Sequence, residues 1–359
     1  MTSSATALGG AGPRLRAVPL ARDRRLWLAV GGIAVAIAGA LLGIALGSVR
    51  VPPGDTVAIL VDRLLGTQLS SADPALVAIV WDLRVPRVLT ALIVGTGLAV
   101  AGATFQGLLR NPLADPYVLG TASGAALGAA IAYLLPVRGL VLGFGLVHAL
   151  AFFGALAAIT VVWKLSRVSG LSPLTSLLLT GYAVASLLSA GLAMAMYLSG
   201  AALRQIFGFL LGSFDLASWE RLAGALPIVV LGTLLILARA RSLNGLLLGE
   251  ETASHLGINV GRERALLLAL ASLVTAAAVT ISGLIGFVGL VVPHVVRLLV
   301  GPNARAVLPI SAIWGANLLI FADLAARLAG DIPVGVVTAI IGAPFFLALL
   351  RRARTGYEL

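Results

Sequence analysis

The chain lacks most of the residues that soluble enzymes use for chemistry. It has no cysteine, which excludes disulfide bonds and thiolate metal sites. Its one lysine, Lys164, lies in the segment VVWKLS, so a GxxxxGK[ST] nucleotide-binding loop is excluded and any ATP hydrolysis must take place in another polypeptide. Its three histidines lie far apart, and no triad or carboxylate pair is arranged for catalysis. We therefore expect no enzymatic activity, no metal site and no bound cofactor in this chain.

Charge is also scarce, at 11% of the 359 residues, whereas 60% are hydrophobic. Soluble domains have about 45–50% apolar residues. The apolar residues occur in many segments of about 17–25, the length that lets a helix cross the ~30 Å hydrocarbon layer. A β-barrel would instead show short alternating segments. The composition therefore predicts an all-α, polytopic membrane protein.

The clearest span lies in the stretch from Arg84 to Ala130. It opens with RVPR, runs for about 22 residues without a charge, and breaks at two corners, Asn111-Pro112 and Asp115-Pro116. The run 265–300 would be ~54 Å long as one helix, too long for a bilayer, so we expect it to fold into two spans at Ser282-Gly283. With these the sequence predicts ten spans: 26–49, 85–109, 118–135, 140–163, 174–198, 222–238, two within 265–300, 307–328 and 335–350.

An even number of spans places both termini on one side. If that side is the cytoplasm, it holds most of the 25 basic residues, and the opposite side has no net charge. The net charge of +11 then follows from the positive-inside rule, and binding to nucleic acid is not needed to explain it. We expect a cytoplasmic tail at 1–25, one transmembrane domain at 26–352 with a cytoplasmic loop at 239–264, and a cytoplasmic tail at 353–359.

Four stretches together carry a family resemblance. They are RVPRVLTALIVGTGLAVAGATFQGLLRNPLADPYVLGTASGAALGA, LLLGEETASHLGINV, SGLIGFVGLVVPHVVRLLVG, and ADLAARL followed by IPVGVVTAIIGAPFFLALLRR. In order and spacing they closely resemble the permease subunits of bacterial type II ABC importers for ferric siderophores, haem and cobalamin (the BtuC/FecCD-like family). The resemblance implies a multi-pass protein of the bacterial inner membrane. It also implies a homodimer that works with two cytoplasmic ATPase subunits, which use ATP and magnesium, and with an extracytoplasmic solute-binding protein.

Three arginines are candidates for docking the binding protein. Arg84 and Arg87 lie three residues apart at the start of a span, where simple snorkelling is the alternative. In the family, arginines at these positions and at Arg327 pair with glutamates of the binding protein, so the resemblance implies that role here. Asp323, the only acid well inside an apolar run, is placed to pair with Arg327 at i,i+4.

The segment GEETASHLG in the cytoplasmic loop resembles the part of the family that contacts the ATPase. The alternative is a solvated connector. The resemblance implies two short helices whose contacts are Gly249, Glu250, Ala253, Leu256 and Gly257. The spacing of Ala253, Leu256 and Val260 predicts one apolar face, and Gly257 can end the first helix.

The corner at 111–116 is a turn by composition. In the family this corner helps to close the cytoplasmic end of the pathway, which makes Asn111 and Leu113 gate candidates. Leu174 and Thr175, at the corner before the fifth span, are a second and weaker pair. We expect the cargo to be an iron chelate such as a ferric siderophore, with cobalamin or haem as alternatives. An ion-coupled secondary transporter is the competing class, and the scarcity of acids inside the spans speaks against it.

Overall fold

The computed structural model describes residues 22–47, 49–67, 72–136, 140–141, 144–166 and 173–354. These residues are helical almost throughout, apart from loops and one small antiparallel pair, β1 (Leu140–Val141) with β2 (Phe144–Gly145). The all-α class is therefore confirmed. The helices that are long and apolar enough to cross a membrane number seven among the described residues. They are α1 (Arg22–Ala45), the continuous run Pro74–Leu108, α6 (Leu146–Ser166), α7 (Pro173–Leu198), α9 (Trp219–Ala238), α12 (Val260–Ser282) and α14 (Ala304–Leu328).

Further elements complete the bundle. Three of them, α5 (Thr121–Leu134), α13 (Val288–Val300) and α15 (Val334–Arg354), correspond to the expected third, eighth and tenth spans. The total of ten and the common side of the termini stay predictions. The remaining elements are α2 (Pro53–Leu65), α3 (Pro74–Val77), the π-helix η1 (Ala78–Arg84), η2 (Pro116–Leu119), η3 (Gly200–Ala202), α8 (Leu203–Leu211), α10 (Ala240–Leu248) and α11 (Glu250–His255).

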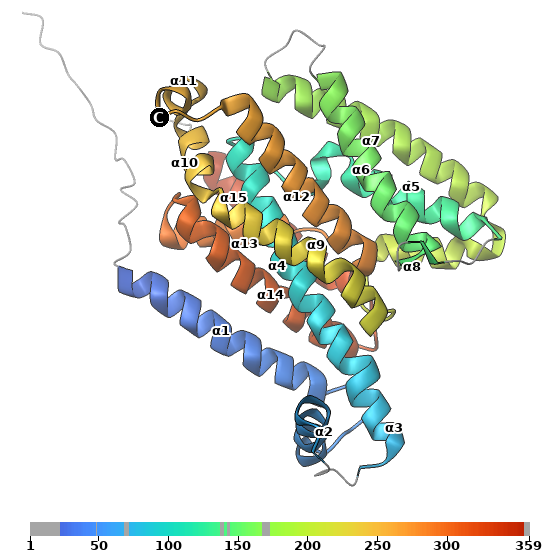
Figure 1. Ribbon diagram of the computed structural model, residues 1–359. Coiled ribbons are helices and arrows are strands. Elements are labelled where there is room, and N and C mark those ends of the chain that lie inside the picture. Colours follow the sequence, from blue (N-terminus) through green and yellow to red (C-terminus); the bar gives the residue numbers. More distant parts are fainter. Residues whose placement is uncertain are drawn as a thin grey trace, which may run out of the picture.

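Helix α4 (Val85–Leu108) is the centre of the structure (Figure 1). It packs against α9, α12, α13 and α14, and nearly all of its side chains are buried. A Cβ added to Gly95 would lie 2.2 Å from the backbone oxygen of Gly315 in α14, so these two helices touch backbone to backbone. Lipid gives helices no hydrophobic reason to associate, and small residues that allow such close packing supply the attraction instead.

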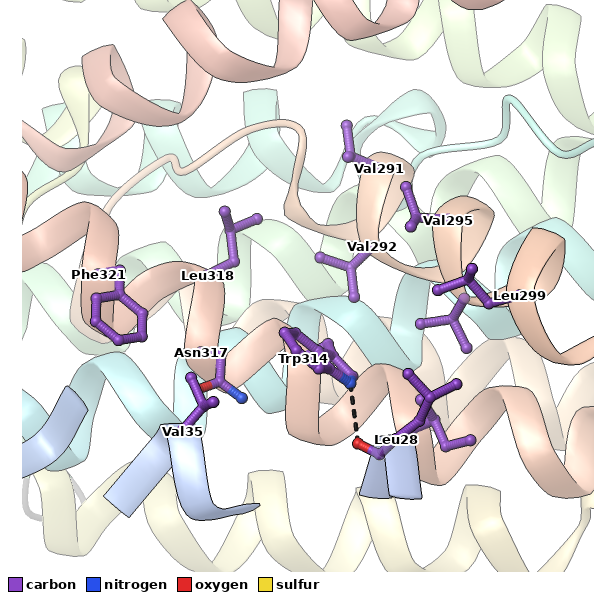
Figure 2. Close-up of a pocket in the computed structure, with 12 residues that line it drawn as sticks. Leu28, Val35, Val291, Val292, Val295, Leu299, Trp314, Asn317, Leu318 and Phe321 are labelled. Atoms are coloured by element: carbon purple, nitrogen blue, oxygen red, sulfur yellow. Dashed lines mark hydrogen bonds between the residues drawn. The ribbon is translucent and has the colours of Figure 1, made fainter. Parts of the chain in front are cut away.

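Helix α1 lies along α14 at one edge of the bundle (Figure 1). The indole nitrogen of Trp314 donates to the backbone oxygen of Leu28 at 3.3 Å, and the amide of Asn317 donates to that of Gly32 at 2.9 Å. Between α1, α13 and α14 is a cavity of about 460 Å³, shown in Figure 2. Its lining is apolar except for Asn317, so it offers no charged group to a ligand.

The break expected in the run 265–300 is confirmed. Helix α12 ends at Ser282, and Gly283 adopts φ +66°, a left-handed conformation that suits glycine and turns the chain toward α13.

Two expected boundaries are wrong. The helical run that contains the second span begins at Pro74 rather than at residue 85, because the Asp73 carboxylate accepts the Ala75 N–H at 2.8 Å and Pro74 starts the helix. The third span begins at Thr121 rather than residue 118, because Gly120 (φ +81°) separates it from the 3₁₀ turn η2.

Candidate functional site

The predicted docking arginines meet at one end of the bundle, where α1 ends and α4 begins. Arg84, Arg87 and Arg327 all line a cavity of about 440 Å³ together with Asp215 and Asp331. We call it the arginine cavity. It collects residues from η1, α4, α14 and the loop after α8, so packing of distant segments assembles it.

Arg84 holds the end of α1. Its guanidinium is buried and donates to the backbone oxygens of Ile44 at 2.9 Å and Ala45 at 2.8 Å, and also to that of Val49. The last carbonyls of a helix have no partner within the helix, and Arg84 supplies one. A Cβ added to Gly47 would lie 2.8 Å from the guanidinium, so glycine leaves room for it. This side chain is therefore a structural anchor.

Arg87 and Arg327 share one buried carboxylate. Arg87 binds Oδ1 of Asp323 at 2.9 Å, and Arg327 lies 3.1 Å from Oδ2, which is the predicted i,i+4 pair. Asp323 is 1% exposed. Arg327 is also buried and donates to the backbone oxygen of Leu46 at 2.9 Å. A second carboxylate, Asp215, binds Arg87 at 2.9 Å from the solvent side.

The three arginines therefore converge as expected, but they are not equivalent surface charges. Arg84 and Arg327 are buried, because the carbonyls that end α1 and the carboxylate of Asp323 both need partners away from water. Only Arg87 forms an ion pair with an exposed partner, Asp215, whose side chain is 52% exposed. The docking role itself stays a prediction.

The predicted gate corner lies at the other end of α4. Oδ1 of Asn111 accepts the Leu113 N–H at 2.9 Å, and Asn111 is exposed while Leu113 is half-buried. The Asp115 carboxylate accepts the Tyr117 N–H at 2.8 Å. Burial raises the pKa of the Asp115 carboxyl to about 6, although this N–H lowers it. The Tyr117 hydroxyl donates to the backbone oxygen of Ile285 at 3.0 Å, which fixes the corner against the chain between α12 and α13.

The second predicted gate cannot be described in the same way. Helix α7 begins at Pro173, and the side chain of Leu174 and the residues 167–172 lie outside the described part of the chain. Thr175 is exposed in the first turn of α7.

The predicted ATPase-contacting loop consists of two short helices, α10 and α11, joined at Gly249 (φ +124°). Gly257 (φ +78°) lies just after α11, the second of the two helices, rather than at the end of the first, which Gly249 terminates. The single apolar face of Ala253, Leu256 and Val260 is wrong, because only Ala253 lies in α11, where it is fully buried. Leu256 follows that helix and is 62% exposed, and Val260 begins α12. Glu250 is half-exposed and forms an ion pair with Arg264 at 2.5 Å.

Two functional candidates were missed from the sequence. Arg110 (φ +47°), at the gate corner, donates twice to the backbone oxygen of Leu246, at 3.0 Å and 2.7 Å, and so joins the corner to α10. Asp215 joins the arginine cavity across a large sequence separation. The only sequence signal for Asp215 was its position as an acid in a short polar loop between apolar helices, and this position did not predict that it pairs with Arg87.

Comparison with known proteins agrees with this architecture. The FecCD transport family matches residues 34–352. The chain is 48% identical to the cobalamin import system permease of Halobacterium salinarum, over 76% of this chain and 73% of that one. It is 42% identical to the hemin transport system permease of Yersinia pestis, over 77% of this chain and 84% of the relative.

A solved structure agrees as well. It is an ABC transporter assigned to the metal-chelate type, in an inward-facing conformation, and it superposes with a TM-score of 0.78 at 31% identity over 90% of this chain and 99% of that one. Seven membrane-length helices within the described part of the chain, together with these matches, identify a multi-pass protein of the cytoplasmic membrane. The chain belongs to the FecCD transport family, the membrane permeases of ABC importers, in which a partner subunit carries the ATPase.

Proposed function

We propose that this chain is the permease subunit of an ABC importer for a metal chelate. It would act as a homodimer of ten-span subunits with two ATPase subunits and an extracytoplasmic binding protein. The observation that carries the proposal is the family match over residues 34–352, which includes both the arginine cavity and the segment α10–α11. We place α10–α11 and both termini in the cytoplasm, because the basic residues gather on that side.

The arginine cavity would receive an acidic side chain of the binding protein. Arg87 is the arginine whose ion pair reaches solvent, whereas Arg84 and Arg327 form the wall behind it. A fixed positive charge at the surface chiefly provides steering and register for an acidic partner.

The segment α10–α11 would take up the motion of the ATPase. Glu250 and Leu256 present exposed surface to such a partner, and the hydrogen bonds from Arg110 to Leu246 link the segment to the gate corner. Arg110→Ala should therefore lower transport while the ATPase still binds. Arg305→Ala, which removes an exposed arginine from the first turn of α14, outside the α10–α11 segment, is the matched control. Equal transport by both variants would rule out this link.

The cargo class is a metal chelate. The relatives carry the names of cobalamin, hemin and Fe(3+)-citrate permeases, at 48%, 42% and 38% identity. The spans of this chain are poor in charge, and selectivity would then lie mainly in the binding protein. We propose ferric chelates, the cargo expected from the sequence, and cobalamin, the cargo of the 48% identical relative, as the first to test.

Uptake in cells with and without the chain tests the proposal. Radiolabelled ferric siderophore, ferric citrate, cobalamin and haem are offered in parallel. We expect one label to enter only when the chain and an ATPase that copurifies with it are both present. Uptake that persists without any ATPase and collapses with an uncoupler would instead show an ion-coupled secondary transporter.

A further inference from the structure

The two carboxylates on Arg87 differ in how firmly they are held. Asp323 is 1% exposed and bridges two arginines, so removing it would leave buried charges unpaired. Asp215 reaches the same guanidinium, but its side chain is 52% exposed. Exposed ion pairs contribute about 0–1 kcal/mol. Asp215 is therefore the partner that Arg87 can exchange at little cost.

The exchange would leave the rest of the arginine cavity in place. Arg84 stays bound to the carbonyls that end α1, and Arg327 stays bound to Asp323 and Leu46. Asp331 also lines the cavity. A carboxylate that arrives from solvent therefore finds one replaceable position, the one that Asp215 occupies.

Asp215 also lies beside a firmly held part of the chain. The Ser213 N–H donates to the backbone oxygen of Ser282 at the end of α12, at 2.9 Å, and the Gly335 N–H at the start of α15 donates to Gly212 at 3.2 Å. Phe214 is 1% exposed. Residues 212–214 directly follow α8 and connect it to α12 and α15, so the ion pair of Asp215 ties this junction to α4.

We propose that Asp215 is a built-in occupant of the docking position: it neutralises Arg87 in the free permease, and a carboxylate of the binding protein replaces it on docking. This inference rests on the proposed docking function of the arginine cavity. Replacement frees the loop at Asp215 from α4. The junction of α8, α12 and α15 then loses its ion pair to α4, because residues 212–214 belong to that junction. Docking at the surface is thereby connected to the helices that follow the loop.

The test uses the transporter complex in nanodiscs and the solute-binding protein that copurifies with it. Asp215→Asn removes the competing charge, and we expect the binding protein to bind about two- to five-fold more tightly, the equivalent of an exposed ion pair. Glu220→Gln removes another exposed acid near the same loop and is the control for net charge. Asp215→Glu, which keeps the competing carboxylate, should bind as the wild type does.

Two further measurements separate the possible failures. In an Arg87→Ala background, Asp215→Asn should have no effect on affinity beyond that of Glu220→Gln, because the pair is already broken. If Arg87→Ala by itself leaves docking intact, the docking function of the cavity is wrong. If Arg87→Ala weakens docking but Asp215→Asn in the wild-type background also weakens it or matches Glu220→Gln, Asp215 merely positions Arg87 and this inference is wrong.

Discussion

The anchoring role of Arg84 gives the sharpest prediction, because its contacts with the end of α1 were not predicted from the sequence. Arg84→Ala leaves the backbone oxygens of Ile44, Ala45 and Val49 without their donor. Each buried acceptor that loses its donor costs about 1–3 kcal/mol. Three acceptors are affected, but the hydrogen bonds to Ala45 and Val49 are only partly buried, so water can replace part of what is lost. We therefore expect the free energy of unfolding to fall by about 2–5 kcal/mol. Arg84→Lys should lower the free energy of unfolding by less, since an ammonium can still donate to one carbonyl but lacks the planar fork that binds several.

Denaturation of the purified protein measures the loss, with the exposed Arg50→Ala as the control. The chain has no cysteine, so a spin label on Leu42→Cys reports the mobility of α1 at a single place. We expect Arg84→Ala to increase that mobility and Arg50→Ala to leave it unchanged. The reasoning is refuted if Arg84→Ala is as stable as Arg50→Ala, keeps α1 fixed, and loses only the docking of the binding protein.

Two other predictions concern α4 and the gate corner. Gly95→Ala should destabilise the protein by about 1–3 kcal/mol in denaturation, because the new Cβ would lie 2.2 Å from the backbone oxygen of Gly315, whereas Gly31→Ala has nothing within 4 Å and should be neutral. Burial raises the pKa of Asp115 to about 6, so the folded state binds its proton more tightly and the stability from this group falls as pH rises from about 4 to 6. Asp115→Asn should remove that part of the pH dependence; parallel pH curves for wild type and variant would contradict it.

The sequence by itself determined the class of protein and the break between α12 and α13. Long apolar runs with few charges have one stable solution, helices across a bilayer, because a backbone in lipid must satisfy its own hydrogen bonds. Gly283 ends α12 because glycine adopts a positive φ at little cost, and this property depends only on the residue itself. Even the pair Asp323–Arg327 could be predicted, because a helix brings residues four apart together.

Only the tertiary structure decided what each charged residue does. Arg87 and Asp323 are 236 positions apart in the chain, and Arg84 donates to carbonyls about 40 positions earlier. Residue spacing along one helix therefore cannot predict either contact. Helix packing brings them together, and burial then assigns the roles. Arg84 and Arg327 lie where unpaired carbonyls and a carboxylate need a donor, whereas Asp215 stays at the solvent edge. Sequence patterns record which residues one helix places side by side; the partner on another helix depends on how closely small residues such as Gly95 and Gly315 let the backbones approach.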